Sequence, residues 1–188
     1  MTRIGVIAED TSDVEVTKAL LLKLKSPKSF CVRHFVGDGC GKLRNKCRAW
    51  AQQLHLRGCS ALLLIHDLDR RDLAQLHRDL VAALEPCPIT KHAIVIPIEE
   101  IEAWLMCDAN ALKRVFSLKK LPKLPGNPEL VTSPKERLES LIWIQSRKTR
   151  RYIHTVHNVT IAKQVTVSSL RKCSAFRHFE RFVRTELA

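Results

Sequence analysis

Short apolar runs alternate with segments of helical periodicity over the first two thirds of the chain. Four segments have the length and composition of strands, at residues 3–8, 30–36, 61–65 and 93–98. The third run is apolar at every position, which is typical of a strand covered by helices on both faces. The pattern therefore predicts four strands of one sheet.

Amphipathic helices are expected after each of these strands. The first is expected to run from an N-cap at Thr11, Ser12 or Asp13 to the break at Ser26 and Pro27, and the second over residues 42–57 with Gly58 as C-cap. The third is indicated by the apolar stripe Leu73, Leu76, Leu80 and Leu84. The fourth is expected over residues 101–116. A strand followed by a helix, repeated along the chain, favours parallel strands joined by right-handed crossovers. The predicted fold class is α/β, a four-stranded mainly parallel sheet flanked by helices.

The last third of the chain has a different pattern. Residues 117–134 hold four prolines and one glycine, which predicts an irregular segment. Helices are expected near residues 135–145, 156–165 and 174–187. The predicted organisation is an α/β core over 1–116, a proline-rich linker that wraps the core over 117–134, and a basic helical extension packed on the core over 135–188.

Charge adds a class of partner to this picture. The chain has 32 Lys and Arg against 19 Asp and Glu, a net charge of +13, and most of the surplus lies after residue 112. A basic face of this kind attracts nucleic acid, although a solvated helical surface is the alternative interpretation. The candidate nucleic-acid contacts are Lys42, Arg44, Arg70, Arg71, Lys148, Arg150 and Arg151.

Composition favours an ordinary globular domain. Hydrophobic residues make up 45% and aromatic residues 5% of 188 residues, which excludes disordered and fibrous classes. The seven cysteines form no C-x-x-C pair and are interpreted as reduced thiols. The start MTRIGVIAED is unlike a secretory or transit peptide, and no apolar stretch approaches the roughly 20 residues that cross a bilayer. We expect a cytoplasmic protein with no membrane partner.

Acidic residues follow three of the expected strands. Glu9 follows the first, Asp67 and Asp69 follow the third, and the cluster Glu99, Glu100 and Glu102 follows the fourth. The carboxyl ends of parallel strands share one edge of a sheet, where open α/β sheets bind ligands. Gathered carboxylates favour a hard cation such as Mg²⁺ or Mn²⁺. Helix capping and first-turn electrostatics remain the structural alternatives for these residues.

Other polar motifs are less specific. The turn over residues 37–41 precedes a helix and could present backbone N–H groups to a phosphate, but it lacks the Lys-Ser/Thr of a P-loop, so a plain turn is favoured. His66 has two equal interpretations, packing under the sheet or acting at the site. His154 and His157 are interpreted as substrate-facing or supporting residues, and Trp104 as core.

The chain also resembles a known family in its motifs. The stretch IAEDTSDVEVTKALL resembles the first motif, and LLLIHDLDRRD the second, of TOPRIM domains, the catalytic module shared by topoisomerases, primases and OLD nucleases. The segments IPIEEIEAWLMCD, GNPELVTSPKERL, HNVTIAKQV and LRKCSAFRHFERFV are similar to small bacterial stand-alone TOPRIM-like proteins. The chain departs from the first motif in one place, because Asp10 stands where TOPRIM domains usually have Gly.

The resemblance implies a site and an activity. It implies that Glu9 is a metal ligand or general acid/base, that Asp67 and Asp69 bind Mg²⁺, and that Glu100 and Glu102 help to bind a second metal. The expected function is a Mg²⁺-dependent nuclease acting on DNA or RNA, in bacterial phage defence.

Two alternatives remain open at this point. One is a noncatalytic nucleic-acid-binding partner of an ATPase in a defence or toxin system. The other is a receiver-like phosphoacceptor domain, with Glu9 and Asp10 as the Mg²⁺ pair and Asp67 as the acceptor. That class also needs a Ser or Thr after the fourth strand and a Lys after a fifth, and the sequence shows neither.

Overall fold

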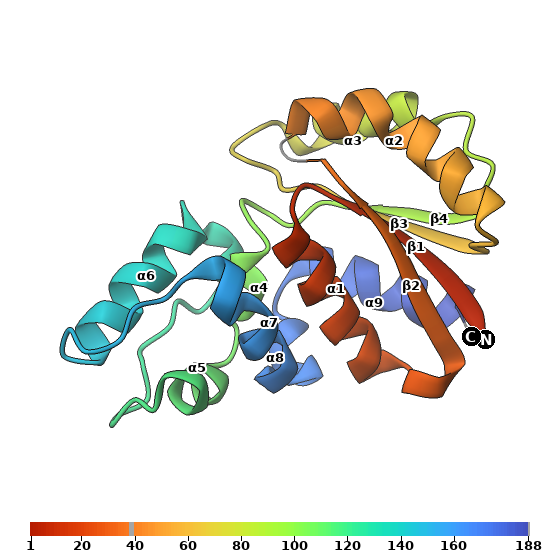
Figure 1. The fold of residues 1–188 in the computed structure, drawn as a ribbon. Coiled ribbons are helices and arrows are strands. Elements are labelled where there is room, and N and C mark those ends of the chain that lie inside the picture. Colours follow the sequence, from red (N-terminus) through yellow and green to blue (C-terminus); the bar gives the residue numbers. More distant parts are fainter. Residues whose placement is uncertain (38–39, 188) are drawn as a thin grey trace.

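Four parallel strands form the centre of the computed structural model, which describes residues 1–37 and 40–187 (Figure 1). The strands are β1 (Thr2–Ala8), β2 (Phe30–Val36), β3 (Ala61–Ile65) and β4 (Lys91–Val95), in the order β2-β1-β3-β4. The α/β fold and the parallel four-stranded sheet are thus confirmed. The fourth strand begins two residues before its predicted start and ends before Pro97, which has no N–H for a strand ladder.

The strand order places a topological switch point between β1 and β3. The chain leaves β1 on one side to form β2 and then crosses β1 to form β3 on the other side. In register, Ile4 of β1 pairs with both Val32 and Ala61. The crevice outside the carboxyl ends of the two strands at such a point is where open α/β sheets bind ligands.

Helices cover both faces of the sheet. Figure 1 shows α2 (Cys40–Leu56) and α3 (Leu73–Leu84) on one face, and α1 (Thr11–Leu24) and α9 (Ser174–Glu186) on the other. Side chains alternate along each strand, so successive residues enter different cores. In β3, Leu62 and Leu64 pack under α2 and α3, whereas Ala61, Leu63 and Ile65 join the larger core that includes α1 and α9.

The beginnings of the first two helices differ from their predicted positions. Asp10 is the N-cap of α1, because its carboxylate accepts a hydrogen bond from Asp13 N at 3.1 Å and the Asp13 carboxylate accepts one from Asp10 N at 3.2 Å. Asp10 therefore performs a capping role at the position where TOPRIM domains usually have Gly. The helix α2 begins at Cys40, so Gly41 of the predicted turn is helical, and residues 38 and 39 of that turn lie outside the described residues.

The single helix predicted over 101–116 is wrong. The chain forms two helices, α4 (Glu102–Leu105) and α5 (Ala109–Phe116). Asp108 separates them, because its Oδ1 accepts hydrogen bonds from Asn110 N and Ala111 N and its Oδ2 accepts one from Thr166 N at 3.0 Å. Burial raises the pKa of Asp108, but these hydrogen bonds outweigh burial and hold the pKa below its ordinary value.

The C-terminal helices are close to their predicted positions. Residues 117–133 are irregular apart from one 3₁₀ turn, η2 (Pro128–Leu130), and a second, η1 (Pro27–Ser29), precedes β2. The helices that follow are α6 (Pro134–Gln145), α7 (His154–Gln164), α8 (Val167–Leu170) and α9, of which the short α8 was not predicted. Within the described ranges, no helix is long and apolar enough to cross a membrane.

An ion-paired carboxylate fastens α9 to the end of α8. Glu180 is buried, and Arg171 and Arg184 donate hydrogen bonds to its carboxylate at 2.7 and 2.8 Å. The hydrogen bond from Arg171 lowers the pKa of Glu180 most, burial opposes it, and Arg184 helps to bring the pKa to about 2. The ionised form of Glu180 is therefore stabilised in the folded protein.

Replacement of Glu180 by glutamine is expected to reduce the free energy of unfolding at neutral pH by roughly 1–3 kcal/mol, the scale of hydrogen bonds to charged groups. Because the folded pKa is lowered, this contribution is complete above the unfolded pKa near 4.5 and is lost as pH falls towards about 2. Urea unfolding at pH 7 and pH 3 measures it. Glu186→Gln, an exposed position of the same helix, is the matched control, and a difference between Glu180→Gln and wild type that does not shrink at pH 3 would contradict the argument.

Candidate metal centre at the carboxyl edge of the sheet

Four carboxylates lie around the switch point of the sheet. Glu9 directly follows β1, and Asp67 lies two residues beyond the end of the neighbouring strand β3. Asp13 lies in the first turn of α1, which begins close to the end of β1, and Glu102 is the first residue of α4. The strands and helix starts therefore bring together residues that are up to 93 positions apart in the sequence.

Glu9 is held by the backbone and side chain that follow β3. Its Oε1 accepts a hydrogen bond from Asp67 N at 3.0 Å and lies 2.9 Å from His66 Nδ1. The same Nδ1 lies 2.7 Å from Asp67 O. Because both neighbours of Nδ1 are acceptors, this nitrogen carries the proton. His66 is fully buried, so it both packs under the edge of the sheet and orients Glu9.

Asp67 has the most unusual environment of the group. Its Oδ1 is shielded from solvent and has no hydrogen-bond partner among the residues that the structure describes. Burial, followed by the negative charges of Asp13, Glu102, Glu9 and Asp69, raises the pKa of Asp67 well above its ordinary value. The charge of each neighbouring carboxylate disfavours the ionised form of Asp67. A cation bound beside Asp67 would therefore stabilise that form.

Asp13 is a site residue that sequence reasoning missed. It was considered only as a helix cap, and it does perform that role. Its carboxylate is nevertheless buried, and burial followed by Asp10, Glu102 and Glu9 raises its pKa well above the ordinary value, with the hydrogen bond from Asp10 N acting in the opposite direction. The sequence signal for Asp13 was its place in the first turn of a helix that begins directly after Glu9, because such a helix holds its first turn over the end of the strand.

Glu102 is fixed by residues from the C-terminal part of the chain. Asn158 of α7 donates one hydrogen bond to Glu102 Oε1 at 3.0 Å and another to Ser12 Oγ at 2.9 Å. The Tyr152 hydroxyl lies 3.3 Å from Glu102 Oε1 and is hydrogen-bonded to Asn158 Oδ1. Burial and the charge of Glu102 raise the pKa of Tyr152 far above its ordinary value, so its hydroxyl stays a donor. All four residues are buried.

The other acidic candidates are less enclosed. Asp69 is exposed, and its backbone has a φ of 50°, which is not a strand conformation. Burial and Glu9 raise the pKa of Asp69, while Arg71 and His66 lower it. Glu100 accepts a hydrogen bond from Lys135 N at 2.8 Å at the start of α6. Glu99 Oε2 lies 3.9 Å from Arg70 Nε.

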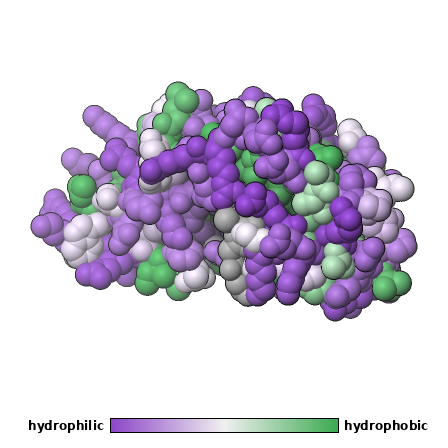
Figure 2. Space-filling model, turned by 90° about the horizontal axis from the view of Figure 1, so that it is seen from above, coloured by the Kyte–Doolittle hydropathy of each residue, from purple (hydrophilic) through white to green (hydrophobic). Residues whose placement is uncertain are grey.

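The predicted nucleic-acid contacts fall on two parts of the surface. Lys42 and Arg44 lie in the first turns of α2, and Arg70 and Arg71 follow β3, where Arg70 donates a hydrogen bond to Ser133 Oγ. The second group, Lys148, Arg150 and Arg151, is exposed after α6. Figure 2, which views the molecule from the side of α2 and α3, shows hydrophilic side chains over most of that face.

The structure gives two other predicted residues local roles. His157 Nδ1 accepts a hydrogen bond from Ile153 N at 2.9 Å, and its ring lies 4.9 Å from the ring of Phe116. This contact places His157 at the start of α7, where it supports the helix terminus. Trp104 is buried in the larger core, as predicted, and its ring contacts Phe176 and Phe179.

The donor chemistry fits a hard cation, although the side chains do not form a complete coordination shell. Across residues 1–37 and 40–187, no three His, Cys, Asp or Glu side chains are arranged as a bound ion requires. Glu9 is turned towards the Asp67 N–H and His66, and Glu102 towards Asn158. Asp67 Oδ1 is the shielded oxygen without a partner, and carboxylate oxygens are the ligands that Mg²⁺ and Mn²⁺ prefer.

Comparisons with known proteins identify a family. The model of a family described as "Domain of unknown function (DUF4276)" matches residues 8–184, which include the four carboxylates and the helices α6, α7 and α8. No curated protein matches the chain, and no solved structure matches it.

Proposed function

This chain belongs to the DUF4276 family, whose description names no activity, and from its acidic site we propose that the protein is a metal-dependent nuclease. One observation carries the proposal. At the switch point of a parallel sheet, Asp67 Oδ1 is shielded and has no partner in the described part of the chain, and the charges of Asp13, Glu102 and Glu9 raise the pKa of Asp67. A site of this kind in a protein with a net charge of +13 suits a polyanionic substrate.

Each residue of the site has a distinct task in this proposal. Asp67, Glu9 and Glu102 would hold Mg²⁺ or Mn²⁺, which when bound activates water and stabilises the leaving oxygen of a phosphodiester. His66 orients Glu9 through its protonated Nδ1. Tyr152 and Asn158 hold Glu102 in place. Arg70 and the basic residues after α6 would bind phosphates of the nucleic acid.

The TOPRIM resemblance is part of the same proposal. Glu9 after β1 and the Asp67–Asp69 pair after β3, on adjacent parallel strands, support a TOPRIM-like site. Asp10 stands where TOPRIM domains usually have Gly. This difference is compatible with such a site, because Asp10 is the N-cap of α1. A role in bacterial phage defence follows from the resemblance alone.

A cleavage panel tests the proposal. We expect the purified protein to cleave at least one of plasmid, linear duplex DNA, single-stranded DNA and tRNA with Mg²⁺ or Mn²⁺, and to be inactive in EDTA. The double variant Asp67→Ala/Asp69→Ala is expected to be inactive on the same substrate. Cleavage that persists in EDTA, or in the double variant, would refute a metal-dependent reaction at this edge of the sheet.

The second candidate function is a noncatalytic nucleic-acid-binding partner of an ATPase. The observation that favours it is the incomplete arrangement of the carboxylates, since no three of the described metal-binding side chains are positioned for an ion. In the same panel, nucleic-acid binding without cleavage under any metal condition would support this candidate and count against the nuclease.

A further inference from the structure

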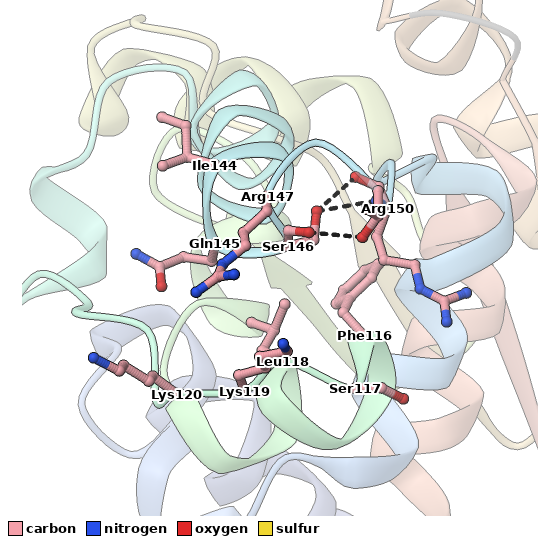
Figure 3. Close-up of a pocket in the computed structure, with 11 residues that line it drawn as sticks. Phe116, Ser117, Leu118, Lys119, Lys120, Ile144, Gln145, Ser146, Arg147 and Arg150 are labelled. Atoms are coloured by element: carbon pink, nitrogen blue, oxygen red, sulfur yellow. Dashed lines mark hydrogen bonds between the residues drawn. The ribbon is translucent and has the colours of Figure 1, made fainter.

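A basic cavity lies apart from the acidic site, between the ends of α5 and α6. Its volume is about 380 Å³. The segment after α5 contributes Lys119 and Lys120, and the segment after α6 contributes Arg147 and Arg150. All four are exposed, and no acidic residue is among the described residues that line the cavity. Figure 3 shows Lys119 and Arg147 extending into the space between the two segments.

Hydrogen bonds fix the turn that forms one wall of the cavity. Ser146 Oγ accepts a hydrogen bond from Arg150 N at 3.0 Å, and Thr149 Oγ1 donates one to Ser146 O at 2.6 Å. Arg147 and Lys148 both have left-handed backbone conformations, with φ of 56° and 64°. Non-glycine residues adopt this conformation at a cost, so the surrounding contacts determine the shape of the turn.

The cations of the cavity are not needed to cap the helices. Basic side chains near a helix C-terminus often bind its last carbonyl groups. At the end of α6, however, backbone N–H groups already donate to Ile142 O, Trp143 O and Ile144 O. In the described chain, the side chains of Lys119, Lys120, Arg147 and Arg150 have no hydrogen bond or ion pair, unlike Arg114 of α5, which donates to Gln164.

A wall of aromatic residues connects the cavity to the acidic site. Phe116 lines the cavity, and its ring centroid lies 6.5 Å from that of Tyr152. The Tyr152 hydroxyl contacts Glu102 on the other side. Two buried aromatic rings therefore separate the cavity from the buried Glu102 carboxylate.

From this geometry, we propose that the cavity between α5 and α6 binds a phosphate group, which Lys119 and Arg147 contact directly. The proposal rests on the nuclease function and names a second contact for its substrate. The shared chemistry is a phosphate, whether it is an internal phosphodiester, the 5′ end of a strand or the phosphate of a free nucleotide. Clustered, unpaired Lys and Arg side chains around a concave site are suited to this anion.

Binding without catalysis tests the cavity. A fluorescent single-stranded 12-mer is titrated with protein in EDTA at fixed ionic strength, and anisotropy reports binding. The variant Lys119→Ala/Arg147→Ala is compared with Lys123→Ala/Arg137→Ala, which removes the same charge from exposed positions outside the cavity. We expect the cavity variant to lower affinity about tenfold and to flatten the salt dependence by roughly 0.7 per lost phosphate contact. The control variant should lower affinity less than threefold.

Further arms identify the source of the phosphate. Loss of affinity that is equal for 5′-phosphorylated and 5′-hydroxyl 12-mers would support an internal phosphodiester, and loss confined to the phosphorylated strand would support an end-binding site. Competition by AMP that disappears in the cavity variant would support a free nucleotide. If the cavity variant and the control variant bind every probe alike, the proposal is overturned. Because EDTA is present throughout, these results are independent of whether the acidic site cleaves.

Discussion

Replacement of Asp67 by asparagine is expected to lower metal-dependent cleavage by about 10³-fold, the scale on which a single well-placed electrostatic group contributes to catalysis. Asparagine keeps the size of the side chain but removes the negative charge that lies among the other carboxylates of the site. The loss should appear in the rate of the chemical step, because Asp67 would hold the metal, while the basic residues that bind the strand are unchanged. Single-turnover cleavage of a labelled oligonucleotide measures it.

Two matched variants sharpen this test. Asp79→Asn removes an acid of α3 that accepts a hydrogen bond from Gln75 Nε2 and should cleave like wild type. Asp69→Asn should have a smaller effect than Asp67→Asn, because Asp69 is exposed. Equal rates for wild type and Asp67→Asn would remove Asp67 from the mechanism, whatever substrate is used.

The second large effect concerns stability in the presence of metal. A ligand at 100 times its Kd stabilises the folded state by about 2.7 kcal/mol. For a domain of this size, that corresponds to a rise in Tm of roughly 5–10 °C. We expect saturating Mg²⁺ or Mn²⁺ to raise the Tm of wild type by this amount and to leave the Tm of Asp67→Asn almost unchanged. Differential scanning fluorimetry with and without EDTA measures both.

In EDTA, the Tm of Asp67→Asn is expected to be higher than that of wild type. Wild type keeps a shielded carboxylate oxygen without a partner beside other carboxylates, whereas the neutral amide of Asp67→Asn removes that repulsion. Asp67→Asn should therefore melt at a higher temperature than wild type when no metal is present. A wild type that is more stable than the variant in EDTA, with no response to any divalent ion, would contradict a metal site at Asp67.

β1, β3 and β4 could be predicted from sequence because each contains a short apolar run, whereas Arg33 and His34 interrupt the apolar residues of β2. Periodicity was less informative where polar side chains decide the structure. Asp108 lies within an amphipathic pattern yet caps α5, and its second carboxylate oxygen binds Thr166, a partner 58 residues away. A pattern of apolar residues contains no information about such a contact.

The candidate site was predictable only where its residues follow strands. Glu9 and Asp67 were found because parallel strands place their carboxyl ends together. Tyr152 and Asn158 were not found, because their positions depend on how α7 packs against α1 and α4. Asp13 was considered only as a cap, because the same residue type serves both roles and its burial is a property of the tertiary structure.

The position of α9 has a consequence for how the protein forms during synthesis. This helix follows every strand in the sequence, yet it covers the sheet beside α1 and packs against β4 (Figure 1). A ribosome adds about 5–20 residues per second, and domains generally fold as units. The part of this face over β4 therefore stays uncovered until α9 has been synthesised, whereas α1 is available to cover β1 and β2 from the start.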